Sequence, residues 1–244
     1  MALKAVANGV FAETHGAWPP RVIALHGWGR RGADFDSVLA GLDAIAVDLP
    51  GFGASPVPEE AIGACGYARL LEPVIEPLEE PPILVGHSFG GRVAVCLAST
   101  TPVGGLVLTG VPLMRRPPAR PAAIFRLLRL ANRIGLVSDD RMERERRRRG
   151  SADYRATSGV MREILVMAVN ESYEAELSAV TAPVALVWGA EDVEVRVSVA
   201  ETAKALLESR HVPVELSVLP AVGHFVPTQD PAGLRRAIDA MLER

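Results

Sequence analysis

The sequence has 244 residues, of which 49% are apolar and 23% charged, and its formal net charge is −3. This composition is typical of a globular chain and excludes a disordered chain, a collagen-like repeat and a coiled coil. The small net charge provides no basic field of the kind that nucleic-acid-binding proteins use.

Short apolar runs alternate along the chain with longer segments of helical periodicity. The dipeptide Asn8-Gly9 predicts a tight hairpin turn, because both residues accept a positive φ. In residues 67–78 apolar side chains recur every three or four positions, which predicts a helix, and Asp230-Pro231 is typical of a helix start. The alternation predicts an α/β protein whose parallel sheet is covered by helices on both faces. Buried strands are predicted at residues 21–25, 44–47, 83–85, 105–108, 184–188 and 214–218.

Residues 112–181 break this alternation, since they contain helical patterns and no credible strand. Within residues 112–155 there are 13 arginines and 5 acidic residues. Three interpretations are open: a solvated helical surface, a lid that attracts anionic substrates or a membrane surface, and a nucleic-acid site. We expect the solvated surface, and the lack of interleaved aromatic residues argues against nucleic acid. Three arginines share one face of a predicted helix: Arg126, Arg129 and Arg133.

The cysteines and the N-terminal segment bear on the compartment of the protein. Cys65 and Cys96 provide neither a disulfide framework nor a metal-ligand cluster, and we expect both to be reduced thiols. The first ten residues lack the pattern of a signal peptide, and no run reaches the about 18 apolar residues of a membrane helix. These features predict a cytoplasmic protein without stable membrane association.

The strongest signal for chemistry is the segment 86–91, Gly-His-Ser-Phe-Gly-Gly, between a predicted strand and an apolar helix at 93–98. The pattern G-x-S-x-G requires small residues beside the serine, because the turn from strand to helix is too sharp for side chains. Such a turn presents the hydroxyl of Ser88 at the positive end of the following helix. Ser88 is therefore the candidate nucleophile.

A serine hydroxyl needs a neighbouring base and an acid that orients this base. Among the histidines, we expect His15 and His211 to be solvated, and the sharp turn directs His87 away from Ser88. His224 follows the last predicted strand, at the sheet edge where sites of α/β proteins form, and is the candidate base. The loop after the strand 184–188 offers three acids: Glu191, Asp192 and Glu194.

With these motifs in this order, the sequence resembles the α/β-hydrolase family over nearly its whole length. His26-Gly27-Trp28-Gly29 is similar to the family's H-G-x-G after the third strand. Residues 48–55, Asp-Leu-Pro-Gly-Phe-Gly-Ala-Ser, are similar to its D-x-P-G-x-G-x-S after the fourth strand, which shapes a turn and a pocket wall. The resemblance implies an eight-stranded, mostly parallel sheet built from residues 1–111 and 182–244. It also implies an all-helical cap, residues 112–181, between the sixth and seventh strands.

The resemblance implies roles for individual residues. Ser88, Asp192 and His224 would form a catalytic triad, with Asp192 chosen because it is the fourth residue after Trp188. The backbone N–H groups of Trp28 and Phe89 would form the oxyanion hole. No metal and no cofactor are implied. Substrate contacts are implied for five residues: His26, Gly27, Trp28, His87 and Phe225.

Within the family, the sequence is similar to small carboxylesterases. Serine rather than aspartate at position 88 argues against the dehalogenase and epoxide hydrolase branches. The predicted function is hydrolysis of a small-molecule carboxylic ester through an acyl-enzyme intermediate. Two alternatives stay open. Gly90-Gly91-Arg92 also resembles the menaquinone-pathway lyase, whose substrate is anionic, and a ligand receptor or signalling protein with slow turnover would carry the same triad.

Overall fold

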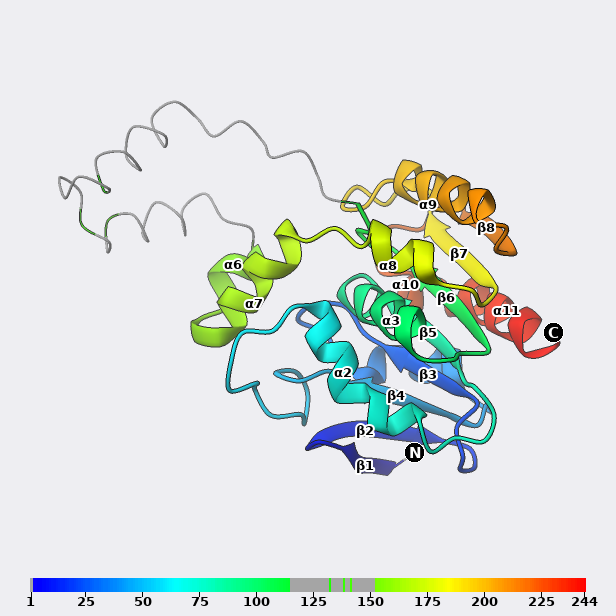
Figure 1. Ribbon diagram of the computed structural model, residues 1–244, viewed down its shortest axis with the longest axis horizontal. Coiled ribbons are helices and arrows are strands. Elements are labelled where there is room, and N and C mark those ends of the chain that lie inside the picture. The colour runs from blue at the N-terminus through cyan, green and yellow to red at the C-terminus, as the bar shows by residue number, and fades with distance from the viewer. Residues whose placement is uncertain (1, 115–131, 133–137, 139–140, 142–151) are drawn as a thin grey trace.

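The computed structural model describes residues 2–114, 132, 138, 141 and 152–244, which form one eight-stranded sheet with helices on both faces (Figure 1). The strand order is β1-β2-β4-β3-β5-β6-β7-β8. β2 pairs antiparallel with β1 and β4, and all other pairs are parallel. The predicted fold class is thereby confirmed. The strands are β1 (Ala2–Ala7), β2 (Val10–His15), β3 (Val22–Leu25), β4 (Ala44–Asp48), β5 (Ile83–His87), β6 (Gly105–Thr109), β7 (Val184–Gly189) and β8 (Val214–Leu219).

The strands lie where the apolar runs predict them, and the N-terminal hairpin has the expected turn. Asn8 and Gly9 both adopt positive φ, 49° and 74°, which matches the right-handed twist of the flanking strands. One prediction is wrong in its burial. β8 is an edge strand whose residues are mostly half-buried or exposed, because only one neighbour covers it.

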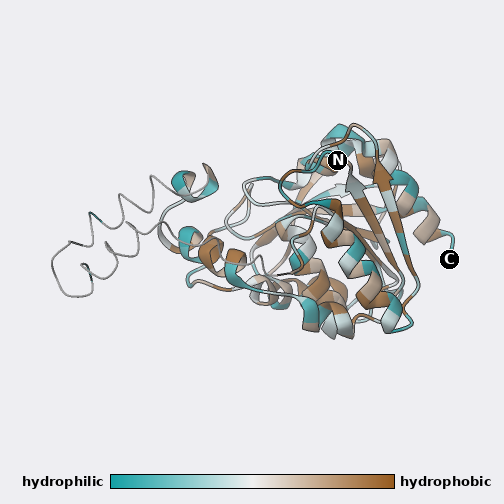
Figure 2. Ribbon diagram, turned by 90° about the horizontal axis from the view of Figure 1, so that it is seen from above, coloured by the Kyte–Doolittle hydropathy of each residue, from teal (hydrophilic) through white to brown (hydrophobic). Residues whose placement is uncertain are grey.

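The helices form two layers, and each layer buries its own hydrophobic cluster against the sheet. α2, α3, α8 and α9 contribute to the cluster on one face, and α1 and α11 to the cluster on the other. Figure 2 shows the hydrophobic strands between the two layers. No helix of the described ranges has both the length and the apolar character needed to cross a membrane. The helices are η1 (Gly32–Phe35), α1 (Asp36–Leu39), α2 (Ala64–Ile75), α3 (Phe89–Thr100), α6 (Ala152–Ala156), α7 (Gly159–Asn170), α8 (Glu174–Ala179), α9 (Val197–Ser209), α10 (Val226–Gln229) and α11 (Pro231–Leu242).

The last helix, α11, begins and packs as its sequence predicts. The side chain of Asp230 accepts a hydrogen bond from the backbone N–H of Gly233 at 2.8 Å, and proline occupies the first helical position. Leu234, Ile238 and Met241 lie on one side of the helix and are buried. The polar residues between them stay on the solvent side, which is why this helix has one apolar stripe.

The prediction of two reduced cysteines is wrong, because Cys65 and Cys96 form a disulfide. Cys65 lies on α2 and Cys96 on α3, and these helices pack side by side on the same face of the sheet, which brings the two Cα atoms within 5.1 Å (Figure 1). The pair is separated by 31 residues, and nothing in that spacing reveals the contact. Since disulfides are rare in reducing compartments, cysteine usage no longer supports a cytoplasmic location.

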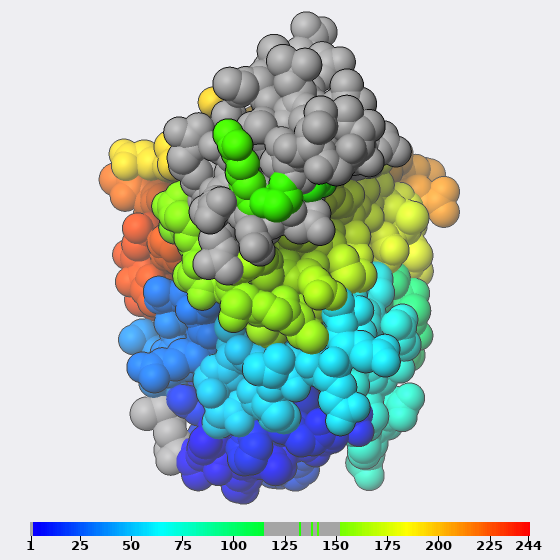
Figure 3. Space-filling model, turned by 90° about the vertical axis from the view of Figure 1, so that its left-hand side faces the viewer, coloured from blue at the N-terminus to red at the C-terminus, as the bar shows by residue number. Residues whose placement is uncertain are grey.

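The described part of residues 112–181 contains α6, α7 and α8, and no strand. α8 packs on α3 and α9 and so belongs to the layer over the sheet. Figures 1 and 3 show α6 and α7 beside the segment that follows β4, where a side chain on Gly51 would collide with Met161 of α7. Outside the described residues lie the three arginines predicted to share a helix face: Arg126, Arg129 and Arg133.

Arg92 of α3 joins the start of this segment and its helix α7 to the core. Its guanidinium is buried and donates hydrogen bonds to the carbonyl oxygens of Pro112 at 3.2 Å and Ala168 at 2.7 Å. The backbone N–H of Tyr173 also donates to the carbonyl of Leu113 at 2.9 Å. The chain therefore leaves the sheet after β6 and returns to it at nearly the same place.

The disulfide predicts a response of stability to reductant. Because a cross-link across a loop of this length restricts the unfolded chain, reduction should lower the free energy of unfolding by about 2–4 kcal/mol. Urea unfolding with and without dithiothreitol measures this, and the double variant C65S/C96S is the control that should not respond. A wild-type midpoint that is the same under both conditions would contradict the bond.

Candidate active site

Ser88 occupies the turn between β5 and α3, in a backbone conformation that few residues other than glycine adopt. Its φ and ψ are 50° and −113°, and such a conformation costs about 1–3 kcal/mol unless the surroundings enforce it. Close packing provides that enforcement. A side chain on Gly90 would lie 2.2 Å from the carbonyl oxygen of Leu25, and one on Gly86 would lie 2.4 Å from Cα of Gly91. The predicted sharp turn is confirmed, and Ser88 itself stays partly exposed.

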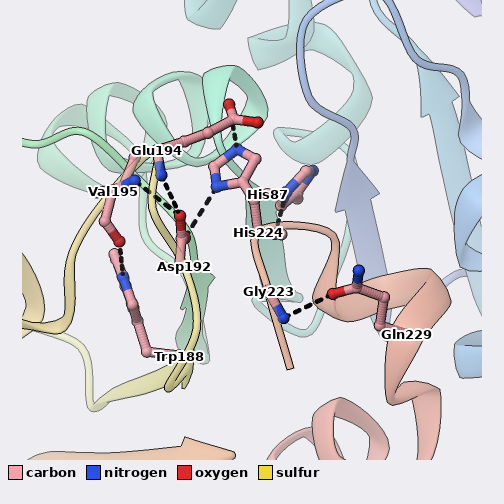
Figure 4. A network of polar contacts seen from close by, with 8 residues as sticks. All are labelled: His87, Trp188, Asp192, Glu194, Val195, Gly223, His224 and Gln229. Carbon is pink, nitrogen blue, oxygen red and sulfur yellow. Dashed lines mark hydrogen bonds and ion pairs between the residues drawn. The ribbon is translucent and has the colours of Figure 1, made fainter. Parts of the chain in front are cut away.

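His224 and Asp192 meet beside this turn, although 32 residues separate them (Figure 4). Nδ1 of His224 lies 2.9 Å from Oδ2 of Asp192, and the two side chains are 7% and 1% exposed. The other carboxylate oxygen, Oδ1, accepts hydrogen bonds from the backbone N–H groups of Glu194 at 2.9 Å and Val195 at 2.7 Å. When Nδ1–H donates to Asp192, the lone pair of the imidazole is on Nε2, the atom that can accept a proton. This arrangement suits a general base.

The two other acids of this loop differ from Asp192 in burial. Glu191 is exposed, and Glu194 is exposed but places Oε2 at 3.7 Å from Nε2 of His224. The loop that carries these acids is also held by Trp188, whose Nε1–H donates a hydrogen bond to the carbonyl of Val195 at 2.8 Å (Figure 4). Among the three predicted acids, Asp192 is thus the one that is both buried and hydrogen-bonded to Nδ1.

Gly110, directly after β6, is a site residue that the motifs did not single out. Its φ is 59°, and a side chain there would lie 2.9 Å from Cε1 of His224 and 3.4 Å from Oδ2 of Asp192. The residue leaves space for the imidazole. Its only signal in the sequence is a glycine directly after a buried strand.

The loop after β3 is held by polar groups of its own chain and of β4. Nδ1–H of His26 donates to the carbonyl of Gly27 at 2.7 Å, and Nε2 accepts the N–H of Leu49 at 3.0 Å. Asp48 accepts the N–H groups of Gly32 and Ala54, both at 2.8 Å. Residues 48–55 therefore shape the turn, as the sequence suggested.

Aromatic rings join this loop to the start of α3. The ring of Trp28 contacts the rings of Phe89 at 5.3 Å and Phe52 at 5.0 Å, each edge to face. Trp28 and Phe89, whose backbone N–H groups are the predicted oxyanion donors, are thus neighbours in space. Trp28 is partly exposed beside them, and so is Phe225.

The prediction that His26 and His87 contact substrate is corrected by their burial. The two side chains are 0% and 2% exposed. His26 is buried because it hydrogen-bonds within its own loop and to Leu49, and His87 is buried because it packs beneath His224. Nε2–H of His87 donates to the backbone carbonyl of His224 at 3.0 Å, and the two ring centroids are 4.9 Å apart (Figure 4). Gly27 must lack a side chain, since a Cβ would lie 2.8 Å from Nδ1 of His87. His87 therefore positions His224 from the side away from solvent.

The two remaining histidines differ in burial. His211 is exposed as expected, whereas His15, expected to be solvated, is only 5% exposed. It ends β2 on the side that faces Asp36 of α1, so its ring is buried although β1 of the same hairpin is mostly exposed.

Of the hollows on the surface of the described residues, two lie at opposite ends of the sheet. One of about 520 Å³ opens beside the loop after β3, where the guanidinium of Arg30 lies 5.2 Å from the ring centroid of Phe225. A larger groove, about 840 Å³, lies at the opposite end of the sheet, near the starts of β3 and β5, and is remote from Ser88. The smaller one is lined by Gly29, Arg30, Arg31, Asp34, Gly51, Phe52 and Gly53.

Known proteins resemble this chain in sequence and in fold. The sequence profile described as the alpha/beta hydrolase family matches residues 22–237. The esterase Rv0045c of Mycobacterium tuberculosis is 40% identical over 111 residues, covering 43% of this chain and 37% of that protein. A pimeloyl-[acyl-carrier protein] methyl ester esterase of Aeromonas hydrophila is 39% identical over 87 residues, 34% of either protein. The chain thus matches little more than a third of the length of these curated relatives.

A solved structure extends the likeness to nearly the whole fold. A thermophilic esterase from Thermogutta terrifontis superposes with a TM-score of 0.66 at 22% identity, over 96% of this chain and 93% of that one. At this identity the likeness concerns the fold.

The buried histidines predict a dependence of stability on pH. Burial lowers the pKa of His26 to about 4 and that of His87 to about 3. The unfolded chain, whose histidines have pKa values of about 6.5, therefore binds more protons below that pH than the folded chain does. Stability should fall as the pH is lowered from about 6.5 toward 4, by up to about 1.4 kcal/mol per pH unit for each group.

Urea unfolding at pH 7.5, 6.5 and 5.5 measures this dependence. The variant H87Q should lose stability less steeply over this range, whereas H211N, at the exposed histidine, should keep the wild-type slope. Equal stability at pH 7.5 and 5.5 in the wild type would show that these rings are accessible to protons.

Proposed function

Because the chain belongs to the alpha/beta hydrolase family, we propose that it is a serine hydrolase that cleaves a small-molecule carboxylic ester. The observation that carries this proposal is the buried hydrogen bond between Asp192 and His224, beside the strained turn that presents Ser88. The esterase names of the curated relatives support the class of reaction. The catalytic groups would be Ser88, His224 and Asp192.

In the proposed reaction, Oγ of Ser88 attacks the ester carbonyl carbon while Nε2 of His224 takes the hydroxyl proton. The carbonyl π electrons move to its oxygen, which becomes an oxyanion bound by the N–H groups of Trp28 and Phe89. Each such donor contributes about 3–4 kcal/mol to the transition state. The intermediate collapses, the alcohol leaves with the proton from His224, and an acyl-enzyme remains.

Hydrolysis of the acyl-enzyme repeats these steps with water as the nucleophile. His224 takes a proton from water, the hydroxide adds to the acyl carbon, and Ser88 leaves with that proton, releasing the carboxylic acid. Asp192 stays ionised throughout and stabilises the imidazolium. Its second oxygen is occupied by the N–H groups of Glu194 and Val195, so the carboxylate is oriented before substrate arrives.

The surroundings of Ser88 favour a substrate with an apolar part. The rings of Trp28, Phe52 and Phe89 form an aromatic cluster next to the proposed oxyanion hole. We propose that residues 112–181 act as the cap over this cluster, with residues 1–111 and 182–244 as the catalytic core. The contact of Met161 with the turn at Gly51 supports this role.

The lyase alternative stays a prediction that rests on Gly90-Gly91-Arg92 and on the arginine-rich segment, most of which lies outside the described residues. The guanidinium of Arg92 itself is buried and binds the carbonyls of Pro112 and Ala168. Slow turnover, as in a receptor or signalling protein, stays an alternative that kinetics decides. An esterase should complete many cycles on an activated short-chain ester, and a receptor should stop after about one acylation.

The remaining expectations on partners stay predictions: a small-molecule substrate, no nucleic acid, no stable membrane association and no cofactor. A cytoplasmic location also stays a prediction, and the disulfide between Cys65 and Cys96 speaks against it.

Replacing Ser88 by alanine tests the nucleophile. Because only a hydroxyl is lost from a turn that glycines define, the variant should stay folded while hydrolysis of p-nitrophenyl esters falls by about 10⁴ or more. Labelling by a fluorophosphonate should disappear with it. Ser99, whose hydroxyl is bound within α3, provides the control S99A, which should be labelled like the wild type. Hydrolysis within tenfold of the wild type in S88A would mean that another nucleophile acts.

Three matched carboxylate variants test the acid. D192N should reduce kcat by about 10⁴, because the amide favours the wrong imidazole tautomer. E194Q should change kcat by no more than about fivefold, since an exposed ion pair contributes up to about 1 kcal/mol, and E191Q should act like the wild type. If E194Q were the inactive variant, the acid would be Glu194. If none were, Asp192 would only stabilise its loop.

A further inference from the structure

Three metal-ligating side chains gather where one face of β2 meets the start of α1. Glu13 and His15 alternate along β2 and therefore share one of its faces, and Asp36, the first residue of α1, lies against them. One ligand atom from each residue falls within 4.8 Å of the others. His15 is paired with Ala44 at the start of β4, whereas Ser88 lies at the carboxyl ends of the parallel strands.

The histidine of this group is buried and lacks a hydrogen-bond partner at the atom that faces the acids. Its side chain is 4% exposed, and Nε2 lies 3.6 Å from Oδ1 of Asp36. Neither atom has a hydrogen bond to any residue that the structure describes. A buried polar atom left in this state destabilises a fold by about 1–3 kcal/mol, so the pair as it stands is incompletely satisfied.

The two carboxylates add an unfavourable interaction of their own. One oxygen of each lies within 4.8 Å of the other, so two negative charges there repel. Arg31, which directly precedes η1, is exposed, and Asp48 accepts two backbone N–H groups. A cation between the three side chains would satisfy the imidazole and neutralise both acids.

We propose that Glu13, His15 and Asp36 bind one divalent transition-metal ion of the zinc class. One imidazole nitrogen and two carboxylate oxygens suit Zn²⁺, whereas Mg²⁺ and Ca²⁺ prefer oxygen ligands alone. Zinc binds such atoms at about 2.0–2.2 Å, so the side chains need to close by about 1 Å, and water completes the four ligands. Both acids are partly exposed, so their side chains have room to move toward the imidazole.

The expected effect of the ion is on stability. It would tie β2 to α1, and α1 follows the loop of Arg30 and Arg31 through η1, so unfolding of this corner would require loss of the metal. The ion is not part of the proposed reaction, because none of its three ligands is among the proposed catalytic groups Ser88, His224 and Asp192.

Isothermal titration calorimetry with ZnCl₂ at pH 7.5, on the metal-free full chain, tests the site. The wild type should bind one Zn²⁺ with a Kd below about 10 µM and should melt at a higher temperature in its presence. E13Q and D36N should each weaken binding by at least about tenfold, and H15Q by more. The two carboxylate variants remove charge from partly exposed side chains, so they stay informative even if H15Q is unstable.

Two controls separate this site from other histidines. H211N replaces an exposed histidine, and H224N removes the imidazole that lies beside Asp192 and Glu194. Both should bind Zn²⁺ like the wild type. The proposal fails if the wild type shows no saturable binding at about 100 µM Zn²⁺, or if H224N rather than H15Q abolishes it.

Discussion

The packing of backbone against backbone at the start of α3 is the constraint on which the rest of the site depends. Gly86 and Gly90 let the first turn of α3 approach β5 and β3 to distances that no side chain would allow: a Cβ on Gly90 would lie 2.2 Å from the carbonyl oxygen of Leu25, and one on Gly86 2.4 Å from Cα of Gly91. Ser88 adopts the strained backbone conformation of this turn. It keeps that conformation because α3 is buried along most of its length. The packed backbone therefore positions the hydroxyl of Ser88, and no contact of the serine side chain is needed for this.

The other site groups follow from the direction of the strands. β3, β5, β6, β7 and β8 run parallel, so their carboxyl ends meet at one edge, and each supplies one loop to it. The loops then pack on one another in a continuous series: Gly27 makes room for His87, His87 supports His224, and Gly110 makes room for the ring of His224 beside Asp192. Each small residue in the series is small because a ring occupies the adjacent space.

The difference between local sequence patterns and tertiary packing explains how much of the fold and of the candidate site was predictable from the sequence. The strands follow from local periodicity, and the turn at Ser88 follows from backbone sterics. The pairing of Asp192 with His224 follows from the order of the motifs. Each of these signals can be recognised within a short stretch of sequence. The disulfide of Cys65 with Cys96 depends on how α2 packs against α3, and the burial of His15 on where α1 lies. His26 and His87 belong to motifs, yet their rings face inward, because a motif specifies a residue type and leaves its neighbours to tertiary packing.

The hydrogen bond between Tyr173 and Leu113 has a consequence for how this protein can diversify. Because the chain that runs from one residue to the other begins and ends at adjoining points, changes of length within it need not shift β6 or β7. The constraint on such changes lies in α7, whose Ile164 and Ala168 are buried in the core cluster and whose Ala168 carbonyl binds Arg92. Under the proposed function, substrate range could then change through this segment while the ends of the parallel strands stay as they are.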